Sequence, residues 1–180
     1  MPLLKKIIII FAIVVLILFI ALVVAAWYLG TFASVKLNLE DRGPYDLVVQ
    51  SQLDSYHKIT NVIENVETML DEKKIKHTTA IVIFYDDPTR IPLQHINIRA
   101  GYIVPDSVEV NPPLIFKTID KRKVAVASIK ANPVIATFKT YPAIQEWMQQ
   151  NGYVEVSNEP TIELYYSNGL VEVEMPVIGN

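Results

Sequence analysis

Glu163 and Tyr165 are the residues of this chain whose types and spacing best suit binding chemistry. They lie in residues 161–166, TIELYY, whose alternation predicts a strand with Thr161, Glu163 and Tyr165 on one face. A carboxylate between a hydroxyl and a phenol needs water or a bonding partner. Two interpretations follow. The segment is an edge strand with Glu163 in solvent, or Glu163 lies in a pocket and meets a ligand there.

Other chemical motifs are weak. The chain has no cysteine, which excludes disulfides, thiol catalysis and thiolate metal sites. No Ser/His/Asp set is evident, and we predict neither a metal nor a cofactor. Asp86 and Asp87 before a proline indicate a turn that ends a strand, and Glu172 and Glu174 indicate a solvated strand face. The three histidines are in no metal-ligand spacing: His57, His77 and His95.

The charge balance argues against nucleic-acid binding. The 180 residues carry a formal net charge of −3, and without Lys5 and Lys6 the remainder has 14 basic and 19 acidic residues. A nucleic-acid-binding domain usually presents a basic face, and none is evident here. We therefore expect no nucleic-acid partner.

Residues 7–29 form an uncharged apolar segment of 23 residues. About 20 apolar residues in a helix cross a bilayer core, so we predict a single-pass membrane anchor in residues 1–30. A cleaved signal peptide is the alternative, with Ala25 and Ala26 before the cut, but its apolar core would be longer than usual. Lys5 and Lys6 mildly favour a cytoplasmic N-terminus, which places the following domain on the trans side, periplasmic or extracellular.

The first half of the domain predicts strands at 35–39, 45–50, 79–85 and 95–104. A helix at about 54–73, capped by Asp54 or Ser55, carries one apolar stripe. Proline-rich residues 105–113 then form a joint between the halves.

The second half predicts strands at 124–129 and 134–138. A helix follows, with Thr140 as its cap, Pro142 in its first turn and Gly152 at its end. Residues 161–166 and 170–177 form a closing hairpin, because Asn168-Gly169 between them is a strong turn signal.

The two halves, about 31–104 and 114–180, repeat in order and in spacing. IVIFYDDP at 81–88 stands 81 residues before IELYYSNG at 162–169. The predicted fold is therefore α+β: a duplicated strand-helix-strand-strand unit with a mostly antiparallel sheet and helices on one side. The junction between two such units is a common position for a ligand groove.

These segments resemble the GyrI-like, or AraC-type effector-binding, domain (SOUL/GyrI-like). The matching stretches cover about 31–180: AIVIFYDDP at 80–88, NIRAGYIV at 97–104, KVAVASIK at 123–130, Gly152-Tyr153, Glu163-Leu164-Tyr165 and EVEMPV at 172–177. The anchor followed by the domain is similar to the architecture of an animal endoplasmic-reticulum autophagy receptor. That receptor acts through a long disordered tail, which we do not expect here, so its role does not carry over.

The resemblance implies a membrane-tethered protein that binds a small molecule without transforming it. The ligand would be lipophilic, aromatic or cationic, and would meet Glu163 and Tyr165 in the groove. By analogy with the family, and from the faces of the predicted elements on which they lie, four further aromatic residues are predicted to line the groove: Tyr45, Phe84, Tyr102 and Phe138. Each of these four could instead pack in the core.

Two alternatives remain open. Some relatives are hydrolases that use a glutamate and a tyrosine in this groove, and Glu163 would serve as general base if burial raised its pKa. In the other alternative the chain is a membrane-anchored scaffold whose surface binds a protein partner.

Overall fold

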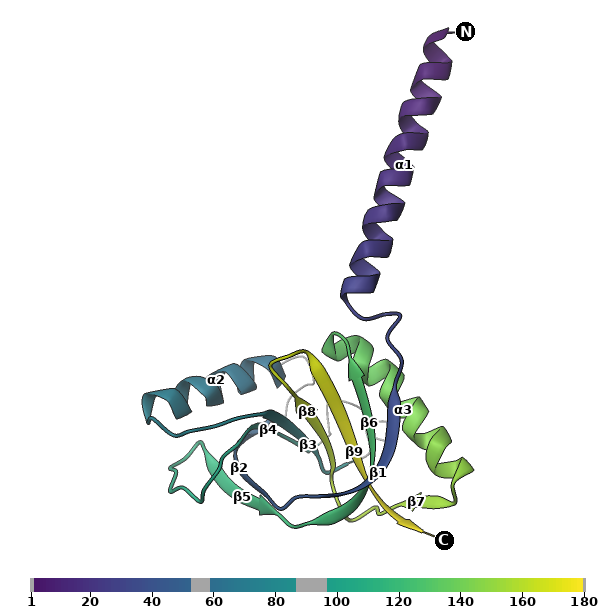
Figure 1. Ribbon diagram of the computed structural model, residues 1–180. Helices are drawn as coiled ribbons and strands as arrows, with labels where there is room; N and C mark the ends of the chain where they lie inside the picture. Colours follow the sequence, from purple (N-terminus) through teal and green to yellow (C-terminus); the bar gives the residue numbers. More distant parts are fainter. Residues whose placement is uncertain (1, 53–58, 87–96, 180) are drawn as a thin grey trace.

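The computed structural model describes residues 2–52, 59–86 and 97–179 (Figure 1). Helix α1 (Pro2–Tyr28) projects from the rest of the chain, which forms an antiparallel sheet covered on one face by α2 (Ile59–Glu72) and α3 (Pro133–Gln150). We call this face, on which α2 and α3 pack, the helix face. The predicted α+β class, with a mostly antiparallel sheet and helices on one side, is confirmed.

The strand order within the described residues is β1-β6-β9-β8-β3-β4-β2-β5, and β7 pairs with β9. This order reads as a mirror image about the β8–β3 pair, which joins the two halves. The strand bounds are β1 Lys36–Arg42, β2 Tyr45–Gln52, β3 Ala80–Phe84, β4 Ile98–Ile103, β5 Ile115–Ile119, β6 Arg122–Lys130, β7 Tyr153–Glu155, β8 Thr161–Tyr165 and β9 Leu170–Gly179.

The repeated unit is therefore β2-α2-β3-β4 in one half and β6-α3-β8-β9 in the other. Each unit is preceded by a strand, β1 or β5, that pairs with the opposite unit: β1 with β6 and β5 with β2. The predicted strand-helix-strand-strand order is confirmed, and the exchanged leading strands tie the two halves together.

Three apolar clusters lie on the helix face, one under α2 and two under α3. The apolar stripe of α2, which includes Val62, Val66 and Leu70, packs on Val82 and other residues of the first half. The inner face of α3 packs on β6 and β9 in the same way. Fully burying an aliphatic side chain contributes roughly 1.5–3 kcal/mol, so each helix holds its place on its own half of the sheet. The predicted cap of α2, and the start of the helix at 54–58, lie outside the described residues.

The prediction of a strand at 134–138 is wrong, because α3 already begins at Pro133. The Asn132 side chain accepts a hydrogen bond from the Val134 amide at 3.0 Å and caps the helix, with Pro133 in its first turn. Thr140 is not a cap. It lies buried within the helix, where its hydroxyl donates to the Ala136 carbonyl at 2.8 Å. The cap and the proline outweigh the strand preference of the β-branched residues that follow them.

The opposite face of the sheet is also closed, because the sheet curls. The Tyr45 hydroxyl on β2 donates to Glu174 Oε1 on β9 at 2.7 Å, although three strands separate β2 and β9 in the sheet. The prediction of a solvated Glu172/Glu174 face is therefore wrong: Glu174 is 0% exposed, and the side chain of Glu172 is 12% exposed.

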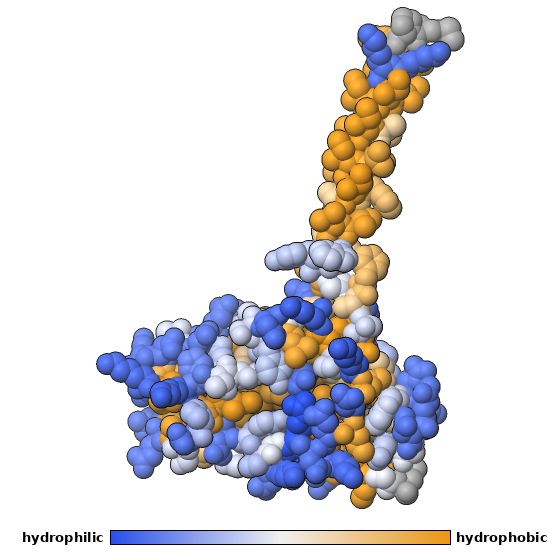
Figure 2. All heavy atoms as spheres, in the orientation of Figure 1, coloured by the Kyte–Doolittle hydropathy of each residue, from blue (hydrophilic) through white to orange (hydrophobic). Residues whose placement is uncertain are grey.

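Helix α1 is apolar over Leu3–Tyr28 and long enough to cross a membrane by length and composition alone. Its side chains are almost all exposed and make no core with the domain. Figure 2 shows the apolar column, with hydrophilic atoms near its free end and over most of the visible domain surface.

Candidate ligand-binding site

Glu163 lies at the centre of the sheet. Strand β8 runs between β9 and β3, and Glu163 pairs with Val82 on one side and Val173 on the other. Because both valines belong to the helix-face cores, Glu163 also points to the helix face. It is 1% exposed, so the solvent-exposed edge-strand alternative is excluded.

Two tyrosines are the polar neighbours of the Glu163 carboxyl group. The Tyr165 hydroxyl donates a hydrogen bond to Glu163 Oε2, and the Tyr141 hydroxyl, from α3, also favours the charged form by hydrogen bonding. Burial acts against both tyrosines and is the larger effect, so the pKa of Glu163 lies above its ordinary value. Oε1 is buried and makes no direct hydrogen bond to a described residue.

Glu163 also has no countercharge in the described part of the chain. No described residue forms an ion pair with Glu163, and no cation contributes to the shift of its pKa. The buried Glu174, on the other face, has two cations: Arg42 Nε lies 3.8 Å from Oε1, and Arg122 Nη2 lies 3.9 Å from Oε2. Burial raises the pKa of both glutamates, but among the described residues only Glu174 has cations beside it that oppose this shift.

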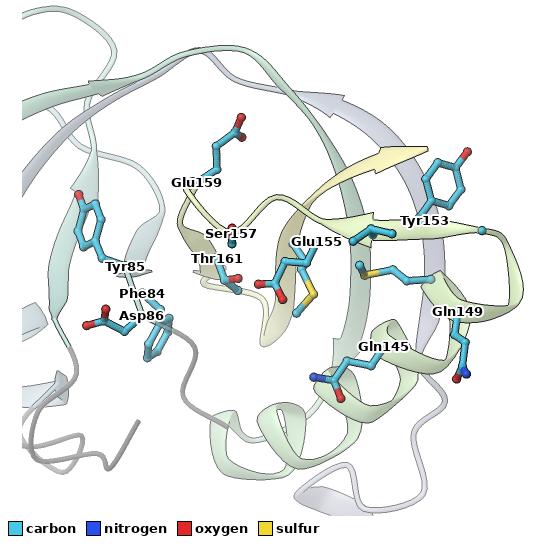
Figure 3. Close-up of a pocket in the computed structure, with 14 residues that line it drawn as sticks. Phe84, Tyr85, Asp86, Gln145, Gln149, Tyr153, Glu155, Ser157, Glu159 and Thr161 are labelled. Atoms are coloured by element: carbon cyan, nitrogen blue, oxygen red, sulfur yellow. The ribbon is translucent and has the colours of Figure 1, made fainter. Parts of the chain in front are cut away.

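A pocket of about 690 Å³ lies at the start of β8 (Figure 3). Glu163 is two residues further along β8 and is not itself among the residues that line the pocket. Thr161 lies on its wall, on the same strand face as Glu163, and pairs with Phe84, which also lines the pocket. Phe84, Tyr85 and Asp86 come from the first half of the domain, and the remaining lining residues come from α3, β7, β8, β9 and the connections on either side of β7. The pocket therefore spans the junction between the two halves.

The pocket lining is acidic and aromatic. Asp86, Glu155 and Glu159 supply carboxylates, and no lysine, arginine or histidine is among the described residues that line it. Tyr153 contributes an aromatic ring that stacks on Trp147 with centroids 5.6 Å apart. Arg122 lies outside the lining and approaches Glu159 only at 4.0 Å. A cation is the ligand that such a lining favours.

The structure brings together only some of the predicted site residues. Tyr165 contacts Glu163, and Phe84 lies both in the core and on the pocket wall. Tyr102 packs under α2 instead, where burial and the nearby Glu67 raise the pKa of Tyr102 to about 12.

The other two predicted residues lie away from Glu163. Tyr45 is on the opposite face of the sheet, bonded to Glu174. Phe138 is 78% exposed on the first half of α3 and does not line the pocket.

The residues that sequence reasoning missed are Tyr141 and the carboxylates of the pocket. Tyr141 was predictable as a buried helix residue, and its hydroxyl group was the available signal, because a buried tyrosine usually has a polar partner. The carboxylates of Asp86, Glu155 and Glu159 come from separate segments, and no sequence pattern links them. Among the described residues, no group of three histidine, aspartate or glutamate side chains could hold a metal ion.

Comparison with known proteins identifies related domains. The sequence profile of the family described as GyrI-like small molecule binding domain matches residues 38–177. The EcmrR C-terminal domain is similar in structure, with a TM-score of 0.68 and 13% identity over 81% of this chain and 99% of that one. No curated protein matches the chain.

Two further solved structures share the fold. SAV2435 bound to tetraphenylphosphonium has a TM-score of 0.51 and 12% identity over 80% of this chain and 94% of that one. A hydrolase from Listeria innocua has a TM-score of 0.56 and 9% identity over 79% of this chain and 92% of that one. In the EcmrR–DNA complex this chain matches 58% of the EcmrR chain, so it spans little more than half of that protein's length.

Proposed function

The chain belongs to the family of GyrI-like small-molecule binding domains, and we propose that it is a membrane-tethered protein that binds lipophilic cations. The ligand would enter the pocket between the two halves and bring its positive charge toward Glu163. The ligand would be bound and released without chemical change.

One observation carries this proposal: Glu163 is a buried carboxylate with no countercharge among the described residues. An unpaired buried charge is costly, and the raised pKa of Glu163 reflects that cost. A bound cation would pair with the ionised carboxylate and remove part of this unfavourable free energy, which would make binding more favourable. Glu174 differs because Arg42 and Arg122 already lie beside it and lower its pKa, although burial still holds that pKa above its ordinary value.

The pocket suits the apolar part of such a ligand. Its volume of about 690 Å³ falls within the usual range of small-molecule sites, roughly 300–1,000 Å³. Phe84, Met148 and Met175 offer apolar and aromatic surface, and the surrounding carboxylates attract positive charge. SAV2435, which shares the fold, has been solved with the lipophilic cation tetraphenylphosphonium.

The experiment is a thermal-shift titration of the full chain in nanodiscs with tetraphenylphosphonium and with neutral triphenylphosphine oxide. Binding to the native state raises the unfolding midpoint by mass action. We expect a larger shift for the cation, and loss of that preference in Glu163→Gln. Glu174→Gln is the matched control: it removes an equally buried carboxylate on the other face, and the preference for the cation should survive.

Equal shifts for both compounds would argue against charge recognition. No shift with either compound or with a wider panel of aromatic cations would contradict the binding proposal and favour the scaffold alternative.

A hydrolase is the second candidate, favoured by the contact of Tyr165 and Tyr141 with a glutamate of raised pKa. Burial shifts the pKa of this carboxyl group upward, which is the direction that general acid–base catalysis near neutral pH requires. Product formation from strained-ring substrates that is lost in Glu163→Gln would support it. Turnover that persists in that variant would exclude Glu163 as the base.

The tether is the remaining part of the proposal. Helix α1 has the length and composition to span a bilayer, and we propose that it holds the domain on the trans side. Carbonate extraction of membranes tests the tether, and protease treatment of intact cells tests the orientation. Release of the chain by carbonate, or protection of the domain from external protease, would contradict the respective claim.

A further inference from the structure

The exposed face of α3 changes polarity along its length. Its exposed residues nearest α1 are apolar, and those in the later turns are polar. The exposed apolar residues are Pro133, Val134, Phe138 and Pro142, and the exposed polar residues are Gln145, Glu146, Gln149 and Gln150. Phe138 is 78% exposed and Val134 is 59% exposed, so neither contributes to the core. An ordinary surface helix would carry polar residues along its whole outer face.

The apolar part of this face lies beside the end of the anchor. The Asn132 amide donates to the Leu29 carbonyl at 2.9 Å, and Lys139 Nζ donates to the Thr31 carbonyl at 2.9 Å. Gly30 has a φ of +80°, and a Cβ there would lie 2.6 Å from Ala131 Cα. The segment after α1 is therefore bonded to the start of α3 at both ends, and its glycine permits direct backbone contact.

These contacts set the height of α3 relative to a bilayer. Residues Leu3–Tyr28 would extend about 39 Å as helix, whereas the hydrocarbon core is about 30 Å thick. Trp27 and Tyr28 are typical of the interface at the far end of the anchor. The first turns of α3 are hydrogen-bonded to Leu29 and Thr31, directly after that interface, which places them at the level of the lipid headgroups.

We propose that the start of α3, together with the exposed Phe32, is a membrane-contact surface that docks the domain on the bilayer. We call Phe32, Val134 and Phe138 the docking patch. The occupant is the phospholipid interface of the membrane that holds α1, and the inference rests on the proposed tether. The patch is continuous with the anchor, and apolar side chains at this depth enter the boundary between headgroups and acyl chains. The later, polar turns of α3 point into water.

The docked position fixes the orientation of the domain. Because α3 runs from the docking patch to the pocket, where Gln145 and Gln149 line the wall, the pocket lies at the end of α3 that is farther from the bilayer. Phe138 thereby receives a role in lipid contact rather than in ligand contact.

The test uses the full chain in liposomes of phosphatidylcholine, and the natural absence of cysteine makes single-cysteine labelling direct. Phe138→Cys carries an environment-sensitive fluorophore on the docking patch, and Val134→Cys is a second reporter of the same patch. Gln150→Cys, at the far end of the same helix, is the matched control, and Val14→Cys reports on the anchor. Quenching by lipids with a shallow doxyl group measures the depth of each label.

We expect blue-shifted, doxyl-quenched emission at positions 134 and 138, and unquenched emission at 150. Quenching at 14 without quenching at 134 or 138 would overturn the docking and leave the tether standing. A label at 14 that is not quenched by deep doxyl lipids would overturn both the docking and the tether. Blue-shifted emission at 138 without doxyl quenching would show that protein, such as a second copy of the chain, covers the patch, and would also overturn the docking.

Discussion

Glu163 on β8 lies directly opposite Val82 on β3, in the register pair where the two halves of the sheet meet. The two residues are 81 apart, which is also the offset between IVIFYDDP and IELYYSNG in the sequence. They therefore occupy the same position in the two repeats, and the pseudo-twofold axis passes between them. One repeat places an apolar residue on the axis and the other places a carboxylate, so the duplicated fold has a single, off-symmetry charge at its centre.

Glu163→Gln is expected to stabilise the unliganded protein at neutral pH. Burial raises the pKa of Glu163 above 4.5, so its contribution to the free energy of unfolding is favourable below pH 4.5 and is lost as pH rises through the folded-state pKa. Glutamine keeps the shape without the charge, and we expect a gain of about 1–3 kcal/mol above that pKa and almost none below pH 4.5. Chemical denaturation across this pH range measures it. A variant that is less stable than the native chain throughout would refute the argument.

Tyr165→Phe should move the pH dependence of cation binding upward. The Tyr165 hydroxyl lowers the pKa of Glu163 by hydrogen bonding, so its removal leaves the carboxyl group protonated to a higher pH. Affinity for tetraphenylphosphonium should rise with pH in both proteins, with a higher midpoint in the variant. Calorimetric titration at several pH values gives the midpoint.

Tyr166→Phe is the matched control for this shift. Its hydroxyl donates to Glu172 Oε2 at 2.8 Å, away from Glu163. Unchanged midpoints in Tyr165→Phe, or equal shifts in both variants, would contradict the assigned contact.

The carboxylates of the pocket should act at longer range than Glu163. Replacing Glu155 and Glu159 by glutamine is expected to weaken tetraphenylphosphonium binding by about 2- to 10-fold at low ionic strength, and by less at high ionic strength, because both side chains are partly exposed and salt screens charges that reach solvent. The exposed Asp106→Asn variant removes a carboxylate outside the pocket and should leave affinity unchanged. An effect that does not respond to salt would point to direct contact with the ligand instead.

Gly101→Ala should destabilise the first half of the domain. A Cβ at Gly101 would lie 2.1 Å from the Val48 carbonyl oxygen and 2.8 Å from Val49 Cα, so β4 and β2 could not keep their pairing. We expect a loss of about 3 kcal/mol or more in the free energy of unfolding, at the upper end of overpacking costs. Gly179→Ala is the control, because its nearest added contact, Tyr153 Cε1, is at an ordinary 3.8 Å. Similar midpoints for the two variants in thermal denaturation would contradict the prediction.

Much of the fold was predictable because its signals are local. The apolar stripe of α2 has the period of a helix, and the Asn168-Gly169 turn joins β8 and β9 as predicted. The start of α3 is ambiguous in the sequence, because Asn132 and Pro133 suit a turn as well as a helix start, and the β-branched residues that follow favour a strand.

The burial of Glu174 could not be predicted in the same way. Alternation places Glu172 and Glu174 on one face of β9, but it does not say whether that face meets water. The answer depends on the curl of the sheet, which brings Tyr45 to Glu174 from β2, three strands away, while Arg122 reaches Glu174 from the neighbouring strand β6. The same limit applies to the pocket, whose carboxylates come from segments with no shared pattern.

By itself the sequence determined the strand-helix-strand-strand order of the repeat, the offset of the repeat and the face of β8 on which Glu163 lies, because each of these depends on periodicity along one stretch of chain. Only the tertiary structure decided that Glu163 is buried without a countercharge among the described residues, whereas Glu174 is buried with two arginines. Burial and pairing of charges depend on side chains that the fold brings together from different strands and helices, and alternation in one strand contains no information about them.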